Sequence, residues 1–145
     1  MQKKLTKLQA YNVMLNFLEL FYLRNESDDI GDLLSDSEFF WGGRTTADPA
    51  SWVKWKEALI LTKKQDEKIR SENRLTYRQS FHVMLNYLKI YRSLWGETED
   101  IDSLIKEVQI LYKTDDENNM MWRRWFEIAG EVSVMEDPRM QKEFK

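Results

Sequence analysis

The sequence contains no cysteine, only two prolines and five glycines, and a single histidine among its 145 residues. Without cysteine, the chain can form neither disulfides nor thiolate metal sites, and it has no thiol nucleophile. So few glycines and prolines disfavour a loop-rich all-β fold. No run approaches the roughly 18 consecutive apolar residues that a membrane-spanning helix needs. These absences predict a helical protein with no membrane partner, which we expect to be soluble and cytoplasmic.

Charge is small overall and uneven along the chain. The net charge is −3, and 42% hydrophobic residues with 13% aromatics indicate a folded chain long enough for one core. Residues 25–50 contain seven acids against Arg44, and residues 96–119 contain eight acids against two lysines, so each segment carries −6. Acidic segments therefore alternate with basic ones.

An internal duplication explains this alternation. The segment LTKLQAYNVMLNFLELFY at 5–22 aligns with LTYRQSFHVMLNYLKIYR at 75–92, and the tetrapeptide VMLN is identical in both. The offset of 70 residues is too long for a solenoid repeat, and only two copies exist. We expect a single domain, residues 1–145, made of two copies at about 5–70 and 75–140.

Two further blocks follow in the same order in both copies. With one inserted residue, DDIGDLL at 28–34 aligns with EDIDSLI at 99–105. Returning to the offset of 70, WVKWKE at 52–57 aligns with WRRWFE at 122–127. Three blocks at nearly constant spacing are strong evidence of duplication.

Capping residues and apolar periodicity predict helices in each block. Thr6 with Gln9, and Thr76 with Gln79, fit the capping box, and apolar residues then recur every three or four positions. Gln9, Asn12, Asn16 and Glu19 form the opposite, polar stripe of the first helix. The predicted fold class is all-α, a compact bundle of about six helices built from two sequence-related halves. We expect long helices at 6–23, 49–70, 75–95 and 118–135, and shorter ones starting at Ser27 or Asp28 and at 100–112, with Asp48, Asp115, Asp116 and Asn118 as further caps.

The stretch MMWRRWFE at 120–127 admits two interpretations. Trp122 and Trp125 are three residues apart and share one helical face, whereas Arg123 and Arg124 point away from it. The first copy keeps both tryptophans and changes the residues between them, as core packing requires. Stacking on nucleic-acid bases would instead need exposed rings in a basic groove. We predict core tryptophans and surface arginines.

No motif indicates catalysis or cofactor binding. His82 lies on a polar stripe, so we predict a solvated histidine rather than a catalytic one. Asp28, Asp32 and Asp36 are spaced four residues apart and could share a helical face, but the calcium-loop pattern of alternating Asp or Asn, a central glycine and a terminal glutamate is absent, so we interpret them as caps and a solvated acidic face. The paired glycines of WGGR lack the context of a phosphate-binding loop. We predict no enzymatic activity, no cofactor and no metal site.

The acidic segments are the feature that points to a partner. A run of charge is often no more than a solvated face. Both runs, however, occupy equivalent parts of the two copies, and the first is followed by the aromatics FFW at 39–41. Concentrated negative charge beside aromatics suits docking on a basic protein surface. The predicted partner-binding residues are Asp28, Asp29, Asp32, Asp36, Glu38 and Trp41.

The first half resembles small bacterial immunity proteins of polymorphic-toxin and contact-dependent growth inhibition systems. The resemblance covers residues 5–59 and is carried by QAYNVMLNFLE, DDIGDLLSD and ADPASWVKW. The second half departs from it, because Asp102 replaces the glycine of DIG and the proline is missing. The resemblance implies a helical protein that binds one cognate toxin domain, commonly a nuclease, and neutralises it in the cytoplasm. A nuclease cleft is basic because it holds an anionic polymer, so an acidic protein suits it.

Two other functions stay open. The chain can be a helical adaptor with a partner that is no toxin, or a nucleic-acid binder that uses Trp122, Arg123 and Arg124. The acidic segment that precedes these residues repels phosphate, so we expect no nucleic-acid partner. The sequence specifies neither the toxin nor the oligomeric state.

Overall fold

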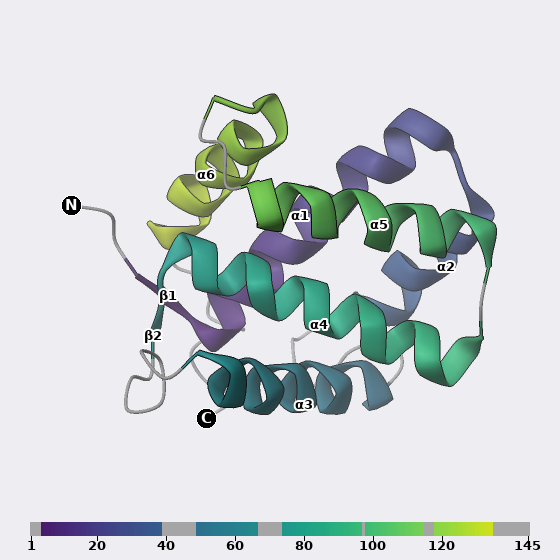
Figure 1. Ribbon diagram of the computed structural model, residues 1–145, viewed down its shortest axis with the longest axis horizontal. Coiled ribbons are helices and arrows are strands. Elements are labelled where there is room, and N and C mark those ends of the chain that lie inside the picture. The colour runs from purple at the N-terminus through teal and green to yellow at the C-terminus, as the bar shows by residue number, and fades with distance from the viewer. Residues whose placement is uncertain (1–3, 39–48, 67–73, 97, 115–117, 135–145) are drawn as a thin grey trace.

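The computed structural model describes residues 4–38, 49–66, 74–96, 98–114 and 118–134. These residues form six helices and one pair of two-residue strands, so the all-α prediction is confirmed (Figure 1). None of these helices is long and apolar enough to cross a lipid bilayer. In chain order the elements are β1 Leu5–Thr6, α1 Lys7–Asn25, α2 Asp28–Ser37, α3 Pro49–Gln65, β2 Arg74–Leu75, α4 Tyr77–Trp95, α5 Glu99–Thr114 and α6 Met120–Ser133.

The two capping boxes form as predicted. The hydroxyl of Thr6 accepts a hydrogen bond from the backbone N–H of Gln9 at 3.1 Å, and the Gln9 amide oxygen accepts from the Thr6 N–H at 2.8 Å. Thr76 and Gln79 repeat both bonds at the same distances. Each pair satisfies two backbone donors that a helix start leaves without an intrahelical partner. Ser27, the predicted start of the second block, caps α2 by accepting from Ile30 N–H at 3.4 Å.

Other helix boundaries differ from the prediction. Leu75 belongs to β2, and α4 begins only at Tyr77, after its cap Thr76. Asn119, rather than the preceding acids or Asn118, caps α6, because its side-chain oxygen accepts from Met121 N–H at 2.8 Å. The predicted caps Asp48, Asp115 and Asp116 lie outside the described residues.

A short antiparallel strand pair joins the two copies, which the sequence did not predict. Leu5 pairs with Leu75, and Thr6 pairs with Arg74. Leu5 and Leu75 are aligned residues of the duplication, and both are buried. Two residues per strand are too few to show a period in the sequence, and buried tertiary contacts hold the pair together.

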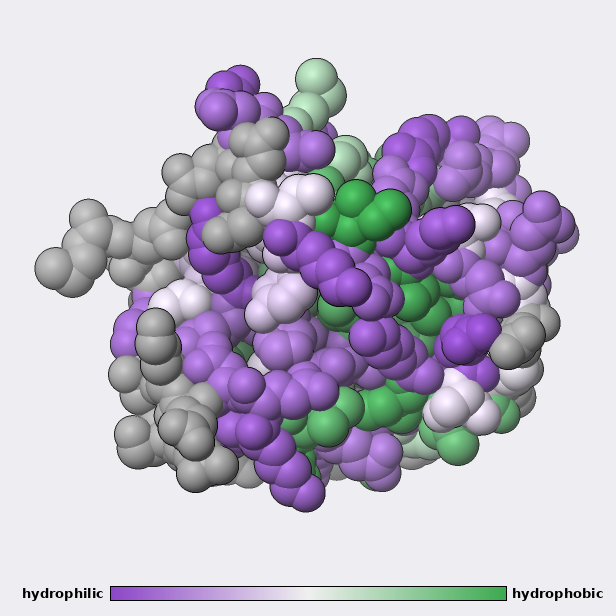
Figure 2. All heavy atoms as spheres, in the orientation of Figure 1, coloured by the Kyte–Doolittle hydropathy of each residue, from purple (hydrophilic) through white to green (hydrophobic). Residues whose placement is uncertain are grey.

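The helices of the two halves interlock. We call residues 4–66 the first half and residues 74–134 the second half. α3 of the first half packs against α4 of the second, and α6 of the second half packs against α1 of the first. Figure 1 shows α4 lying between α3 and α5. Figure 2 shows hydrophilic side chains over most of this face, with apolar atoms mainly between the helices.

The aromatic residues of the core also make contacts between the two halves. Tyr11 contacts Trp52, Trp55 and Tyr87, and Trp55 also contacts Tyr87 at a ring-centroid distance of 5.9 Å. Most of these contacts are edge-to-face, the arrangement that aromatic quadrupoles favour. Each half thus contributes rings to the other half's core. The same four contacts recur among the aligned residues of the other copy, Phe81, Trp122, Trp125 and Phe17.

Candidate partner-binding groove

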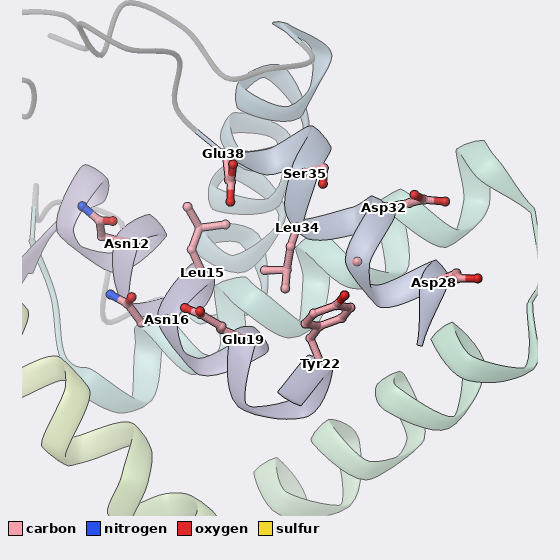
Figure 3. A pocket seen from close by; sticks show the side chains of 11 residues that line it. Asn12, Leu15, Asn16, Glu19, Tyr22, Asp28, Asp32, Leu34, Ser35 and Glu38 are labelled. Carbon is pink, nitrogen blue, oxygen red and sulfur yellow. The ribbon is translucent and has the colours of Figure 1, made fainter. Parts of the chain in front are cut away.

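A groove with a volume of about 610 Å³ runs between α1 and α2 (Figure 3). Leu15 and Leu34, both partly buried, form its apolar floor. We call this feature the acidic groove. Its other lining residues are Asn12, Asn16, Glu19 and Tyr22 of α1, and Asp28, Gly31, Asp32, Ser35 and Glu38 from α2 and its C-terminal cap.

Helical periodicity places these side chains on facing walls. The α1 residues recur at three- and four-residue spacing, so they share the stripe that the core does not use. The stripe is the polar one predicted from the sequence, and it supplies Asn12, Asn16 and Glu19. In α2, Ile30, Leu33 and Ser37 face the core, which turns Ser35 and Glu38 toward α1.

The groove is strongly negative. Four of its lining residues are acids, and among the residues that the structure describes no lysine, arginine or histidine lines it. Within the described ranges, Glu19, Asp28, Asp32 and Glu38 form no ion pair. In Figure 3, Glu38 from the end of α2 and Glu19 from α1 lie on either side of Leu15, whereas Asp28 and Asp32 extend from the outer side of α2.

The structure divides the predicted partner-binding residues. Asp28, Asp32 and Glu38 line the groove. Asp29 and Asp36 are not part of its lining. Burial, followed by the charges of Asp36, Asp32 and Asp29, raises the pKa of Tyr91 to about 12. Trp41, the sixth predicted residue, lies outside the described residues.

The acids of the second half are used within the fold. Asp100 accepts a hydrogen bond from the Ser27 hydroxyl at 2.6 Å, and this bond joins α5 to the cap of α2. Glu107 pairs with Arg24 of the first half at 2.9 Å. Asp102 pairs with Arg92 of α4. The contacts of Asp100 and Glu107 therefore join the two halves, and that of Asp102 joins α4 to α5.

The two halves also differ in charge at the positions that correspond to the groove. The burial of Ile30 and Leu33 matches that of Ile101 and Leu104, which supports the alignment of α2 with α5. The first half has acids at two positions where the second has a cation or a neutral amide. Along the groove, Glu19 corresponds to Lys89, Tyr22 to Arg92, Asp32 to Ser103, Ser35 to Lys106, and Glu38 to Gln109.

Comparison with known proteins gives no match to this geometry. No protein-family model, no curated protein and no solved structure matches the chain. Support for a function therefore comes from the groove itself and from the motifs that resemble immunity proteins.

A buried polar network fixes the position of α2 beside the groove. The Tyr11 hydroxyl donates to the Ser37 carbonyl oxygen at 2.6 Å, and the hydroxyls of Ser37 and Tyr87 lie 2.7 Å apart. Ser51 of α3 donates to the Asp36 carbonyl oxygen at 2.9 Å. Burial raises the pKa of both tyrosines, so both hydroxyls stay neutral. These bonds satisfy the C-terminal end of α2 and hold one wall of the groove rigid.

The tryptophans of MMWRRWFE belong to the core, as predicted. Trp122 and Trp125 are 1% and 0% exposed. Trp125 donates its indole N–H to the Tyr77 carbonyl oxygen at 2.8 Å, as the aligned Trp55 does to the Lys7 carbonyl oxygen at 3.2 Å. Arg124 pairs with Glu127 on its own helix. These buried rings offer no face on which a nucleic-acid base can stack.

His82 is less solvated than predicted. Its ring is half-buried, and Nδ1 lies 3.1 Å from the Tyr112 hydroxyl. Burial lowers the pKa of His82, and this effect exceeds the opposing influence of Asp66. Among the residues that the structure describes, no group of three histidine or acidic side chains could hold a metal ion. His82 is best described as a packing residue that joins α4 to α5.

Proposed function

We propose that this chain is an immunity protein that binds and neutralises a cognate bacterial toxin domain, a nuclease with a basic surface, through the acidic groove. The observation that carries the proposal is the groove itself, which the described part of the chain lines with four acids and no cation. Two of the three motifs that resemble immunity proteins supply most of its lining. QAYNVMLNFLE lies in α1, and DDIGDLLSD supplies nearly all of α2.

The physical argument is one of charge complementarity. The four carboxylates form no ion pair with the described residues and repel one another, and a cationic partner relieves this repulsion. A basic nuclease surface supplies such cations because it has to hold anionic nucleic acid. The apolar floor of Leu15 and Leu34 adds area that a partner can cover. Charge then steers the encounter, and the buried contacts determine how long the complex lasts.

The test combines capture with growth rescue. Tagged protein is used to isolate its partner from native lysate, and the partner gene is expressed with and without this chain. We expect a toxin domain that arrests growth, and we expect growth to recover when this chain is co-expressed. Glu19→Lys, which introduces the residue of the second half, should abolish both capture and rescue at physiological salt.

Glu57→Lys provides the matched control. Glu57 is also an exposed glutamate on a helix, but it lies on α3 and takes no part in the groove. This variant changes the net charge by the same amount and should retain capture and rescue. A captured partner without toxicity would identify an adaptor and contradict the proposal. Equal loss in both variants would show that overall charge, rather than the groove, drives binding.

A further inference from the structure

The second half contains its own arginine where the first half has an open groove. Arg92 of α4 pairs through its guanidinium with Asp102 of α5, so a cation–carboxylate pair connects these two helices. Tyr22 and Gly31 occupy the aligned positions in the first half. A Cβ atom at Gly31 would lie only 2.9 Å from Cε1 of Tyr22, so a carboxylate side chain there would require the Tyr22 ring to shift. The first half therefore lacks the internal arginine of its twin.

Carboxylates nevertheless remain on both walls of the acidic groove. Glu19 extends from α1 and Glu38 from the end of α2, and they lie on either side of Leu15 (Figure 3). The second half has Lys89 and Gln109 at these positions. The first half thus has Tyr22 in place of the paired Arg92, and it carries acids at two positions where the second half has none.

Asn16 and its aligned residue Asn86 also differ in whether their side-chain amides are bonded within the fold. The aligned Asn86 is 2% exposed, and its amide group donates to Thr62 at 2.8 Å and to Gln65 at 2.9 Å. Asn16 lines the groove and is exposed. Within the described part of the chain, its amide forms no hydrogen bond. Its carbonyl oxygen is a further acceptor at the groove wall.

We infer that the acidic groove binds an arginine side chain of the partner, with the guanidinium group between Glu19 and Glu38. The inference rests on the proposed function only for the identity of the protein that supplies this arginine. The methylene groups of the arginine would cover Leu15 and Leu34, as long cationic side chains commonly cover apolar surface. The Tyr22 ring, 36% exposed, lines the same groove and offers a face for stacking.

Arginine fits this arrangement better than lysine does. Its planar guanidinium presents five N–H donors in a fixed fork, which can engage carboxylates on two walls at once. It also stacks on aromatic rings and is more weakly hydrated than an ammonium group. A lysine ammonium is a compact charge that would satisfy one wall at a time.

The test uses two blocked pentapeptides, Ac-Ala-Ala-Arg-Ala-Ala-NH₂ and its lysine counterpart, titrated into the ¹⁵N-labelled full chain. We expect the arginine peptide to shift amide resonances of the groove segments of α1 and α2. We also expect it to bind about tenfold more tightly than the lysine peptide, the effect of one charge-assisted hydrogen bond. Glu19→Lys and Glu38→Gln should each weaken arginine binding by a similar factor. Glu57→Lys should leave it unchanged.

Three outcomes would overturn the inference. Equal affinity for the two peptides, shifts confined to residues outside the groove, or unchanged binding by Glu19→Lys would each show that no arginine site exists there. Failure of the proposed function is distinguishable from failure of this inference. A chain that rescues cells from a toxin but shows no preference for arginine keeps the function and loses the arginine site. A chain that prefers arginine but binds no toxin keeps the site and loses the function.

Discussion

At the scale of single residues, the packing of His82 changes how readily its side chain takes up a proton. It is half-buried against Tyr112, and burial holds its pKa below the usual 6.5. Asp66 opposes this effect, and Lys89 adds to it. The folded state therefore binds the proton more weakly than the unfolded chain does. Stability should fall as the pH drops from 6.5 toward the lower folded pKa, because protonation then favours unfolding.

This pH dependence can be measured by urea unfolding at about pH 7.5 and about pH 5.5. His82→Asn, which introduces the residue of the first half, is the reference because asparagine does not titrate. We expect the free energy of unfolding to decrease more in the wild-type chain than in the variant. Identical decreases would show that His82 is as solvated as the sequence suggested.

The burial of individual residues was only partly predictable from the sequence. The tryptophans of MMWRRWFE could be assigned to the core because the duplication preserves their spacing while the residues between them change. His82 was misjudged because its cover, Tyr112, comes from a helix 30 residues further along the chain. A pattern within one helix carries no information about which side chain of another helix covers it.

At the scale of elements, the capping boxes offer a test with a built-in duplicate. Thr6 and Thr76 make the same two hydrogen bonds at the same distances. Thr6→Ala and Thr76→Ala should therefore each lower the free energy of unfolding by about 1 kcal/mol. Ser93→Ala is the control, because this exposed hydroxyl only donates to a carbonyl oxygen of its own helix. Its effect should stay within about 0.5 kcal/mol.

Chemical denaturation monitored by circular dichroism at 222 nm, the standard helix band, measures all three variants. If only one of the two threonine variants lowered the free energy of unfolding, the two helix starts would not be energetically equivalent.

The acidic groove shows which parts of a site a sequence can reveal. The sequence showed residues of both walls, since α1 has a polar stripe and α2 has clustered acids. The assignment of Asp29 and Asp36 to the partner surface did not anticipate their position, because all five described acids were grouped by proximity in sequence. On a helix, neighbours in sequence point in different directions, and only Asp28, Asp32 and Glu38 line the groove. The contribution of α1 depends on how α1 and α2 pack, and that is tertiary information.

At the scale of the whole molecule, the interlocked halves predict one cooperative unit. α1 loses the packing of α6 and α4 if the second half is removed, and α4 loses α3 and α1 if the first half is removed. Fragments 1–70 and 71–145 should each show little cooperative unfolding alone. Mixed in equal amounts, they should regain helical content and a cooperative transition.

Circular dichroism of the separate and mixed fragments, followed by thermal unfolding, measures this complementation. The intact chain is the reference, and its transition should not depend on concentration, whereas that of the mixed fragments should. Cooperative unfolding of an isolated fragment would contradict the prediction and would show that one half forms a sufficient core.

The strand pair between Leu5 and Leu75 has a consequence for how the sequences of the two halves can diverge. In a symmetric dimer of identical chains, a residue that meets its own equivalent lies at the symmetry axis, and every substitution occurs in both subunits. Joining two copies in one chain keeps these reciprocal contacts. A substitution in one copy then no longer has to occur in the other. Glu19 and Lys89 can then differ while the shared core stays the same. Fusion of the copies thus lets the acidic groove change in sequence while the corresponding residues of the second half keep their internal contacts.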